Sequence, residues 1–260
     1  MSSIVVSEIF HAIQGEGVWT GTPSFFLRTA GCSVKCRNCD TIYSWAKERE
    51  EGIALKIYNE IEVEDLVLQI VESNLRYVVF TGGEPAEQSA TLAELTKNVN
   101  LKDRYFTIET SGNVNFNPTF VHLLSISPKM PGMMARSTDL RVTYAHLQSL
   151  IESMFNAGRM VQLKYVIANE NDFRLAKELT NWAVPEKWRN RIHIIFQPNN
   201  AVFSEVPDRV LSIAQYASNY KVLSGMIVND VMRGGIWDNF PHVKLLMQNH
   251  WIGFGREKGT

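Results

Sequence analysis

The sequence has few cysteines, little net charge and no long apolar run, and each shortage excludes a class of protein. Its three cysteines all lie between residues 32 and 39, and such an odd, clustered set does not make a disulfide framework. The formal net charge of −1 gives no general attraction to nucleic acid or anionic membranes. No apolar run approaches the roughly 20 residues that span a bilayer, and residues 1–10 lack the pattern of a signal peptide. We therefore expect a cytoplasmic protein that has neither a nucleic-acid nor a membrane partner.

The composition predicts one folded domain. The 260 residues are 45% hydrophobic and 20% charged, which is enough apolar surface for a full core. We find no internal repeat, low-complexity segment or linker. Residues 1–260 are therefore expected to form a single domain.

Strand-like and helix-like segments alternate along the chain. Buried strands are expected in SFFLRTA from Ser24, RYVVF from Arg76, RYFTIET from Arg104, HLLSIS from His122, VQLKYVI from Val161 and RIHIIFQ from Arg191. Amphipathic helices are expected at residues 63–74, 90–99, 144–158, 172–183 and 207–220. The charged run KEREEG from Lys47 is interpreted as a solvated loop or helix end. Six such units predict a mostly parallel α/β sheet, an open or partial (β/α)6 barrel rather than a closed eight-stranded one.

Polar motifs follow five of these strands at their carboxyl ends. They are GCSVKCRNCDT, TGGEP, ETSGN, SPKMPG and QPNN. In a parallel sheet these ends share one face, where ligands bind. The sequence therefore predicts an enzyme active site on this face.

The spacing of Cys32, Cys36 and Cys39 suits a loop around an inorganic centre. Structural zinc usually has four protein ligands, and here a histidine would have to complete the set. A cubane iron–sulfur cluster is held by thiolates, and three of them would leave one iron open for another ligand. Three reduced thiols in an ordinary turn are the remaining interpretation.

The motifs together resemble a known family. Cys32-x-x-x-Cys36-x-x-Cys39 followed by TGGEP at 81–85 is similar to radical S-adenosylmethionine (SAM) enzymes. AIQGEG at 12–17, FLRTAGC at 26–32, CDT at 39–41, ETSG at 109–112, SPK at 127–129, LKYVI at 163–167 and FQP at 196–198 resemble the 7-carboxy-7-deazaguanine synthase family, in consistent order from Ile4 to about His250.

The resemblance implies an activity and its cofactors. Family members convert 6-carboxy-5,6,7,8-tetrahydropterin to 7-carboxy-7-deazaguanine with loss of ammonia, a step of 7-deazapurine and queuosine-type biosynthesis. It implies a [4Fe-4S] cluster, SAM and Mg²⁺, a partial barrel of the radical SAM type and a homodimer. An external electron donor such as flavodoxin or ferredoxin would reduce the cluster.

The resemblance also assigns roles to individual residues. It implies cluster ligands at Cys32, Cys36 and Cys39 and a Mg²⁺ ligand at Thr41. The residues implied for the SAM site are Asn38, Cys39, Asp40, Gly83, Glu84, Ser127, Pro128 and Lys129. Those implied for the substrate are Ile13, Gln14, Gly15, Glu16, Arg28, Thr81, Glu109, Gln197 and His250.

Several of these residues also have an ordinary structural interpretation. Thr41 suits a capping or turn threonine, and Arg28 suits a surface ion pair. Arg28 lies in an otherwise buried stretch, however, and its planar fork matches the substrate carboxylate. The chain departs from the family in having Asn38 before its third cysteine and in continuing past His250 through WIGFGREKGT.

Two other functions compete with the synthase. An activase that places a glycyl radical on a partner protein shares the cysteine loop, and a large exposed apolar patch beside the active site would favour it. A non-enzymatic zinc-stabilised binding module would be colourless and would not require TGGEP or SPK. Elemental analysis separates a zinc module from an iron–sulfur enzyme.

Overall fold

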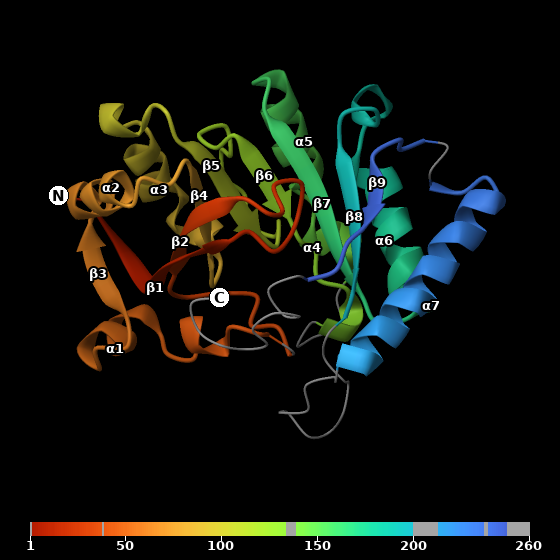
Figure 1. The fold of residues 1–260 in the computed structure, drawn as a ribbon, viewed down its shortest axis with the longest axis horizontal. Helices are drawn as coiled ribbons and strands as arrows, with labels where there is room; N and C mark the ends of the chain where they lie inside the picture. The colour runs from red at the N-terminus through yellow and green to blue at the C-terminus, as the bar shows by residue number, and fades with distance from the viewer. Residues whose placement is uncertain (1, 38, 134–138, 200–212, 237–238, 249–260) are drawn as a thin grey trace.

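The computed structural model describes residues 2–37, 39–133, 139–199, 213–236 and 239–248. These residues form one curved nine-stranded sheet with helices along its outer side (Figure 1). The strands are β1 (Ser3–Ile13), β2 (Pro23–Thr29), β3 (Asn59–Glu62), β4 (Tyr77–Gly82), β5 (Tyr105–Thr110), β6 (Leu123–Ile126), β7 (Met160–Ile167), β8 (His193–Pro198) and β9 (Val243–Leu245). The helices are α1 (Arg49–Ala54), α2 (Val63–Glu72), α3 (Ser89–Thr96), α4 (Leu140–Thr143), α5 (Leu147–Asn156), α6 (Glu170–Ala183) and α7 (Ile213–Met232).

The sheet is open and mostly parallel. Its strand order is β3-β1-β2-β4-β5-β6-β7-β8-β9, and the run from β2 to β9 is parallel throughout. Strand β1 is antiparallel to both β2 and β3. The predicted open α/β sheet is therefore confirmed, and the six predicted strands are β2 and β4 to β8.

The core lies between the sheet and the helices. Alternate residues of each parallel strand point to this side, such as Val78 and Phe80 of β4 and Leu163 of β7. Apolar faces of the helices cover them, as at Leu66 of α2 and Met154 of α5. No helix in the described part of the chain is both long enough and apolar enough to span a membrane.

The other face of the sheet carries polar side chains and is covered by the loop between β1 and β2. Gln14 and Thr22 close this loop through a backbone hydrogen bond of 2.8 Å. Val18 donates its N–H to the Gln162 side chain of β7 at 2.9 Å. Trp19 packs edge-on to Tyr77 of β4, with ring centroids 5.1 Å apart. The loop thus reaches across the inner face from β4 to β7.

The charged run after Lys47 is mostly solvated and lies at the start of a helix, as predicted, but one of its residues turns inward. It includes α1, and Arg49 at the start of this helix turns inward. Arg49 Nε donates to the Ala30 carbonyl at 2.8 Å, and its Nη2 pairs with Glu87 at 2.7 Å. One residue of the run therefore supports the start of the cysteine loop.

Candidate active site

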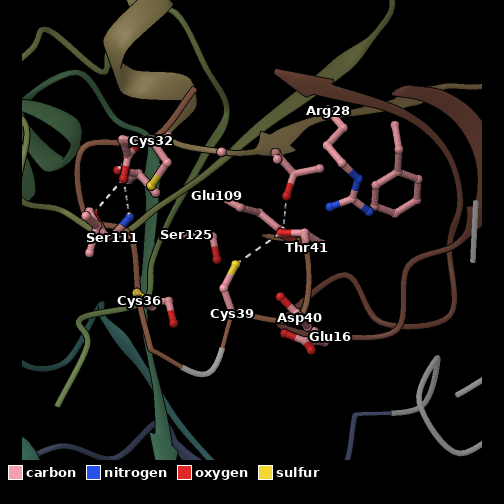
Figure 2. A pocket seen from close by; sticks show the side chains of 18 of the residues that line it. Glu16, Arg28, Cys32, Cys36, Cys39, Asp40, Thr41, Glu109, Ser111 and Ser125 are labelled. Atoms are coloured by element: carbon pink, nitrogen blue, oxygen red, sulfur yellow. Dashed lines mark hydrogen bonds between the residues drawn. The ribbon is translucent and has the colours of Figure 1, made fainter. Parts of the chain in front are cut away.

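A cavity of about 230 Å³ lies at the carboxyl ends of the parallel strands (Figure 2). Inner-face positions of successive strands supply its wall, so Arg28 of β2, Thr81 of β4, Glu109 of β5 and Lys164 of β7 all face it. Residues far apart in the sequence meet here because parallel strands share one end. The volume suits small molecules rather than a folded partner.

The three cysteines line this cavity together. Cys36 is buried, Cys32 and Cys39 are half-buried, and all three thiols are free. Burial raises the pKa of Cys36 to about 11 and also raises the pKa of Cys32. A bound metal centre would have to displace these thiol protons.

The cysteines do not converge on a single metal ion. No group of three His, Cys, Asp or Glu side chains in the described ranges is close enough to hold one. No histidine of the described part of the chain lines the cavity, and His11 instead packs against Phe25. A Cys3His zinc site therefore has no histidine ligand among these residues. Thiols spread around a cavity suit a four-iron cluster better, because each ligates a different iron.

Hydrogen bonds fix the start of the cysteine loop. Gly31 donates its N–H to the Ser44 carbonyl at 2.8 Å, which ties the loop to the short turn that follows it. Ser33 donates its N–H to Glu87 at 2.7 Å, directly beside Cys32. Glu87 also holds Arg49, so the loop is anchored to the segment after TGGEP.

Cys39 has two polar neighbours from the residues that follow it. Trp45 Nε1 donates to Cys39 Sγ at 3.2 Å. Thr41 Oγ1 lies 3.6 Å from the same sulfur (Figure 2). Asp40, Thr41 and Trp45 all line the cavity.

The TGGEP turn packs directly on the backbone of the cysteine loop. Gly83 donates its N–H to Thr29, and Glu84 donates its N–H to Gly31, at 2.9 and 2.8 Å. A Cβ at Gly83 would lie 1.9 Å from the Gly31 carbonyl oxygen, so only glycine fits there. These two N–H groups are therefore occupied within the protein and are not available to a ligand.

The Glu84 carboxylate is fully engaged with the neighbouring strand end. It accepts from Thr110 Oγ1 and Ser111 Oγ at 2.6 Å each and from the Ser111 and Ala86 N–H groups. Burial raises its pKa although these hydrogen bonds act to lower it. Any contact between Glu84 and a ligand is therefore through its backbone.

The SPK turn brings Ser127 and Lys129 to the cavity, whereas Pro128 does not line it. Ser127 donates its N–H to the Thr110 carbonyl at 2.8 Å. Lys129 Nζ lies 3.2 Å from Ser127 Oγ, and the Lys129 N–H donates to Tyr144 at 2.6 Å. Two strand ends and one buried tyrosine thus position these two side chains.

Gln14, Thr81 and Glu109 form a hydrogen-bonded row across the wall. Gln14 Nε2 donates to Glu109 Oε1 at 3.1 Å, and Thr81 Oγ1 donates to Glu109 Oε2 at 3.0 Å. Ile13 and Gly15 also line the cavity beside Gln14. The predicted substrate residues of three separate segments are therefore in contact.

Glu16 is paired within the protein. It forms a buried ion pair with Lys164 and accepts from Gln248 Nε2 at 2.9 Å. Lys164 had no predicted role, although it lies within the LKYVI motif. The positive charge of Lys164 faces Glu16, Glu109 and Asp40, and these carboxylates raise its pKa although burial alone would lower it.

Arg28 forms an ion pair with Glu8, a residue that the sequence analysis did not identify. Its Nε donates to Glu8 of β1 at 3.1 Å, and the Tyr43 hydroxyl donates to the same Glu8 oxygen at 3.1 Å. The guanidinium lies over the Phe10 ring, 5.2 Å from its centroid. The Arg28 side chain is 11% exposed, and no residue in the described ranges pairs with its η nitrogens. The ion pair that was the alternative interpretation of Arg28 is therefore present, but it uses only Nε and leaves both η nitrogens available to a ligand.

Gln197, like Pro128, does not line the cavity. It is buried at the end of β8, and both polar atoms of its amide have no hydrogen-bond partner among the described residues. Asn38 and His250 lie outside the described residues. The roles predicted for these residues stay predictions.

Comparisons with known proteins give a consistent set of relatives. Residues 13–117 match the family model described as a 4Fe-4S single cluster domain. The chain is 30% identical over 223 residues to the 7-carboxy-7-deazaguanine synthase of Hyperthermus butylicus, covering 84% of this chain and 87% of the relative. It is 29% identical to the Bacillus subtilis protein of the same name, covering 99% and 98%. The crystal structure of QueE from Escherichia coli has the same fold, with a TM-score of 0.65, 24% identity and 95% of each chain covered.

Proposed function

Because the chain belongs to the 7-carboxy-7-deazaguanine synthase family, we propose that it converts 6-carboxy-5,6,7,8-tetrahydropterin to 7-carboxy-7-deazaguanine with release of ammonia. It is an enzyme of the radical SAM type that serves 7-deazapurine and queuosine-type biosynthesis. We treat residues 1–260 as one radical SAM domain with an N-terminal substrate-binding segment and a short C-terminal tail. A single observation carries the proposal: the cysteine loop and the polar residues that suit a carboxylated pterin surround one cavity.

The residues around the cavity fit an iron–sulfur cluster with SAM. Cys32, Cys36 and Cys39 are free thiols on one loop, and no carboxylate or histidine joins them in a single-ion site within the described ranges. When bound, the cluster and SAM supply a 5′-deoxyadenosyl radical that abstracts a hydrogen atom. Thiolates from the three cysteines would hold the cluster.

Backbone and side chains around the cluster loop suit the polar ends of SAM. The Gly83 N–H is already bonded to Thr29, so Gly83 offers SAM its carbonyl oxygen, which can accept from the ammonium group. Ser127 and Lys129 offer a hydroxyl and a positive charge. Asp40, which directly follows Cys39, supplies a carboxylate to the cavity. We assign these residues to positioning SAM.

The opposite wall suits the substrate. Arg28 offers its η nitrogens to the carboxylate, held from behind by Glu8. Gln14, Thr81 and Glu109 form a preorganised row for the polar edge of a pterin. Gln197 does not line the cavity, but its buried amide has no hydrogen-bond partner among the described residues, and a buried amide left unsatisfied destabilises a protein unless a ligand satisfies it.

The remaining assignments extend the proposal to metal and partners. We assign Mg²⁺ to Thr41, whose hydroxyl faces the cavity as a hard oxygen ligand, with substrate and water completing the shell. A flavodoxin or ferredoxin would reduce the cluster, and the working enzyme would be a cytoplasmic homodimer. Turnover measured with and without Mg²⁺ tests the magnesium assignment. Turnover by the wild type should depend on Mg²⁺, whereas turnover by Thr41→Val should not respond to the metal.

One anaerobic reaction tests the function. Cluster-reconstituted protein, reductant, SAM, Mg²⁺ and 6-carboxy-5,6,7,8-tetrahydropterin are combined, and the products are identified by mass spectrometry. We expect 7-carboxy-7-deazaguanine from the wild type and neither product nor 5′-deoxyadenosine from Cys39→Ala. Formation of 5′-deoxyadenosine alone would retain the radical chemistry and reject the substrate. Turnover by Cys39→Ala would reject the cluster assignment.

A further inference from the structure

Cys39 differs from the other two cysteines in the hydrogen bond that its sulfur receives. Trp45 Nε1 donates to Cys39 Sγ at 3.2 Å, which is within the range of N–H to sulfur hydrogen bonds. Among the described residues, Trp45 is the only side chain that donates a nitrogen-bound proton to a cysteine sulfur. Cys32 instead receives backbone N–H groups from Val34 and Lys35.

The backbone around Trp45 holds the indole at this sulfur. Trp45 and Ser44 donate their N–H groups back to Ile42 and Thr41, which closes a tight turn immediately after Cys39. Gly31 donates its N–H to the Ser44 carbonyl at 2.8 Å, so the turn is also attached to the start of the cysteine loop. The backbone that carries Trp45 is therefore attached to both the start and the end of the cysteine loop.

We propose that Trp45 is a positioning residue that raises the reduction potential of the cluster through its hydrogen bond to Cys39. The proposal rests on the proposed function, because it requires that Cys39 ligates a cluster. Reduction adds negative charge to the cluster and its thiolates, and a donor to a ligating sulfur stabilises the more negative state. Without the indole N–H, the same cluster is harder to reduce.

The substitution Trp45→Phe removes the donor and keeps an aromatic ring. The measurement is an EPR-monitored redox titration of the reconstituted protein in the absence of SAM and substrate, with iron and sulfide content determined on the same sample. We expect full iron content and a midpoint potential shifted to a more negative value. Tyr43→Phe is the matched control, because the Tyr43 hydroxyl lies on the same turn but donates to Glu8 rather than to sulfur. Its midpoint should equal that of the wild type.

An unchanged midpoint in fully loaded Trp45→Phe would overturn the inference. If that variant does not load iron, 3-benzothienyl-alanine at position 45 replaces the indole N–H by sulfur and preserves the shape of the ring, and the same negative shift is expected. Wild-type protein carrying indole ¹⁵N tryptophan gives an independent readout. The reduced cluster should show hyperfine coupling to ¹⁵N, and its absence would also overturn the inference. A wild type that assembles no cluster would instead reject the proposed function.

Discussion

Glu16 and Lys164 form an ion pair in the wall of the active site although 148 residues separate them in the sequence. Their side chains are 10% and 11% exposed, so water screens neither charge well. Gln248 adds a hydrogen bond to Glu16 from a third segment. The pair therefore joins the loop after β1, the strand β7 and the end of the described chain in one buried polar contact.

We predict that Lys164→Met destabilises the fold by about 3 to 5 kcal/mol. Loss of the ammonium leaves Glu16 buried without its compensating charge, which costs far more than the pair itself contributes. The free energy of unfolding is measured by anaerobic denaturant titration of the cluster-free protein.

The double variant Glu16→Gln/Lys164→Met is the control for this prediction. It removes both charges, so it should recover a substantial part of the lost stability. Equal destabilisation of the single and double variants would show that Lys164 acts through packing rather than through charge.

Arg28→Lys should raise the KM for the carboxylated pterin by about tenfold to hundredfold. Lysine keeps the positive charge but loses the planar fork, whose Nε is held by Glu8 while the η nitrogens face the cavity. Steady-state kinetics measure the KM, and iron content is determined on the same preparations. Normal iron content with a raised KM is expected. Loss of the cluster without a change in KM would remove the assignment to the substrate carboxylate.

His122 should make the fold sensitive to mild acid. Its Nδ1 accepts the Phe106 N–H at 3.1 Å, and burial and the positive charge of Arg159 lower its pKa. A lowered pKa means that the folded state favours the neutral imidazole. The stabilisation is therefore present above the ordinary histidine pKa of about 6.5 and is lost as pH falls through the folded value.

The variant His122→Asn tests this dependence, because the amide oxygen can accept the same N–H and does not titrate in this range. Unfolding midpoints are compared at about pH 7.5 and about pH 5.5. The wild type should lose more stability between these two values than the variant. The same loss of stability in both proteins would assign the acid sensitivity to other groups. His193 is one such group, because burial lowers its pKa as well.

The sequence was sufficient to predict the parallel strands and most of the helices. Strands β2 and β4 to β8 are short apolar runs because both faces of each are covered, and such runs are recognisable without a structure. Strand β1 was missed because a bulge between Val6 and Glu8 interrupts its alternation. Strands β3 and β9 are too short for a pattern, and α7 continues to Met232, beyond the predicted end at residue 220, through Gly225 and several β-branched residues.

The candidate site divides into residues with a motif and residues without one. The cysteine loop and TGGEP were identified from their spacing and their resemblance to a family, and the structure brings both to one cavity. Glu8 and Trp45 were missed because each acts through a single contact with a motif residue. No local pattern reports a contact such as that of Glu8 with Arg28, made across two antiparallel strands.

Gly83→Ala should impair the cysteine loop and reduce cluster loading. A Cβ there would lie 1.9 Å from the Gly31 carbonyl oxygen, a backbone atom that cannot rotate away. The backbone of the loop start must shift, at a cost of about 1 to 3 kcal/mol, and Cys32 follows Gly31 directly. Gly225→Ala in α7 is the matched control, since nothing lies within 4 Å of its added Cβ, and it should be neutral or stabilising by up to about 1 kcal/mol. Iron content and thermal unfolding are compared for the two variants. Normal iron content in Gly83→Ala would mean that the loop adjusts without disturbing the cysteines, and the close approach of the two turns would then not explain the glycine.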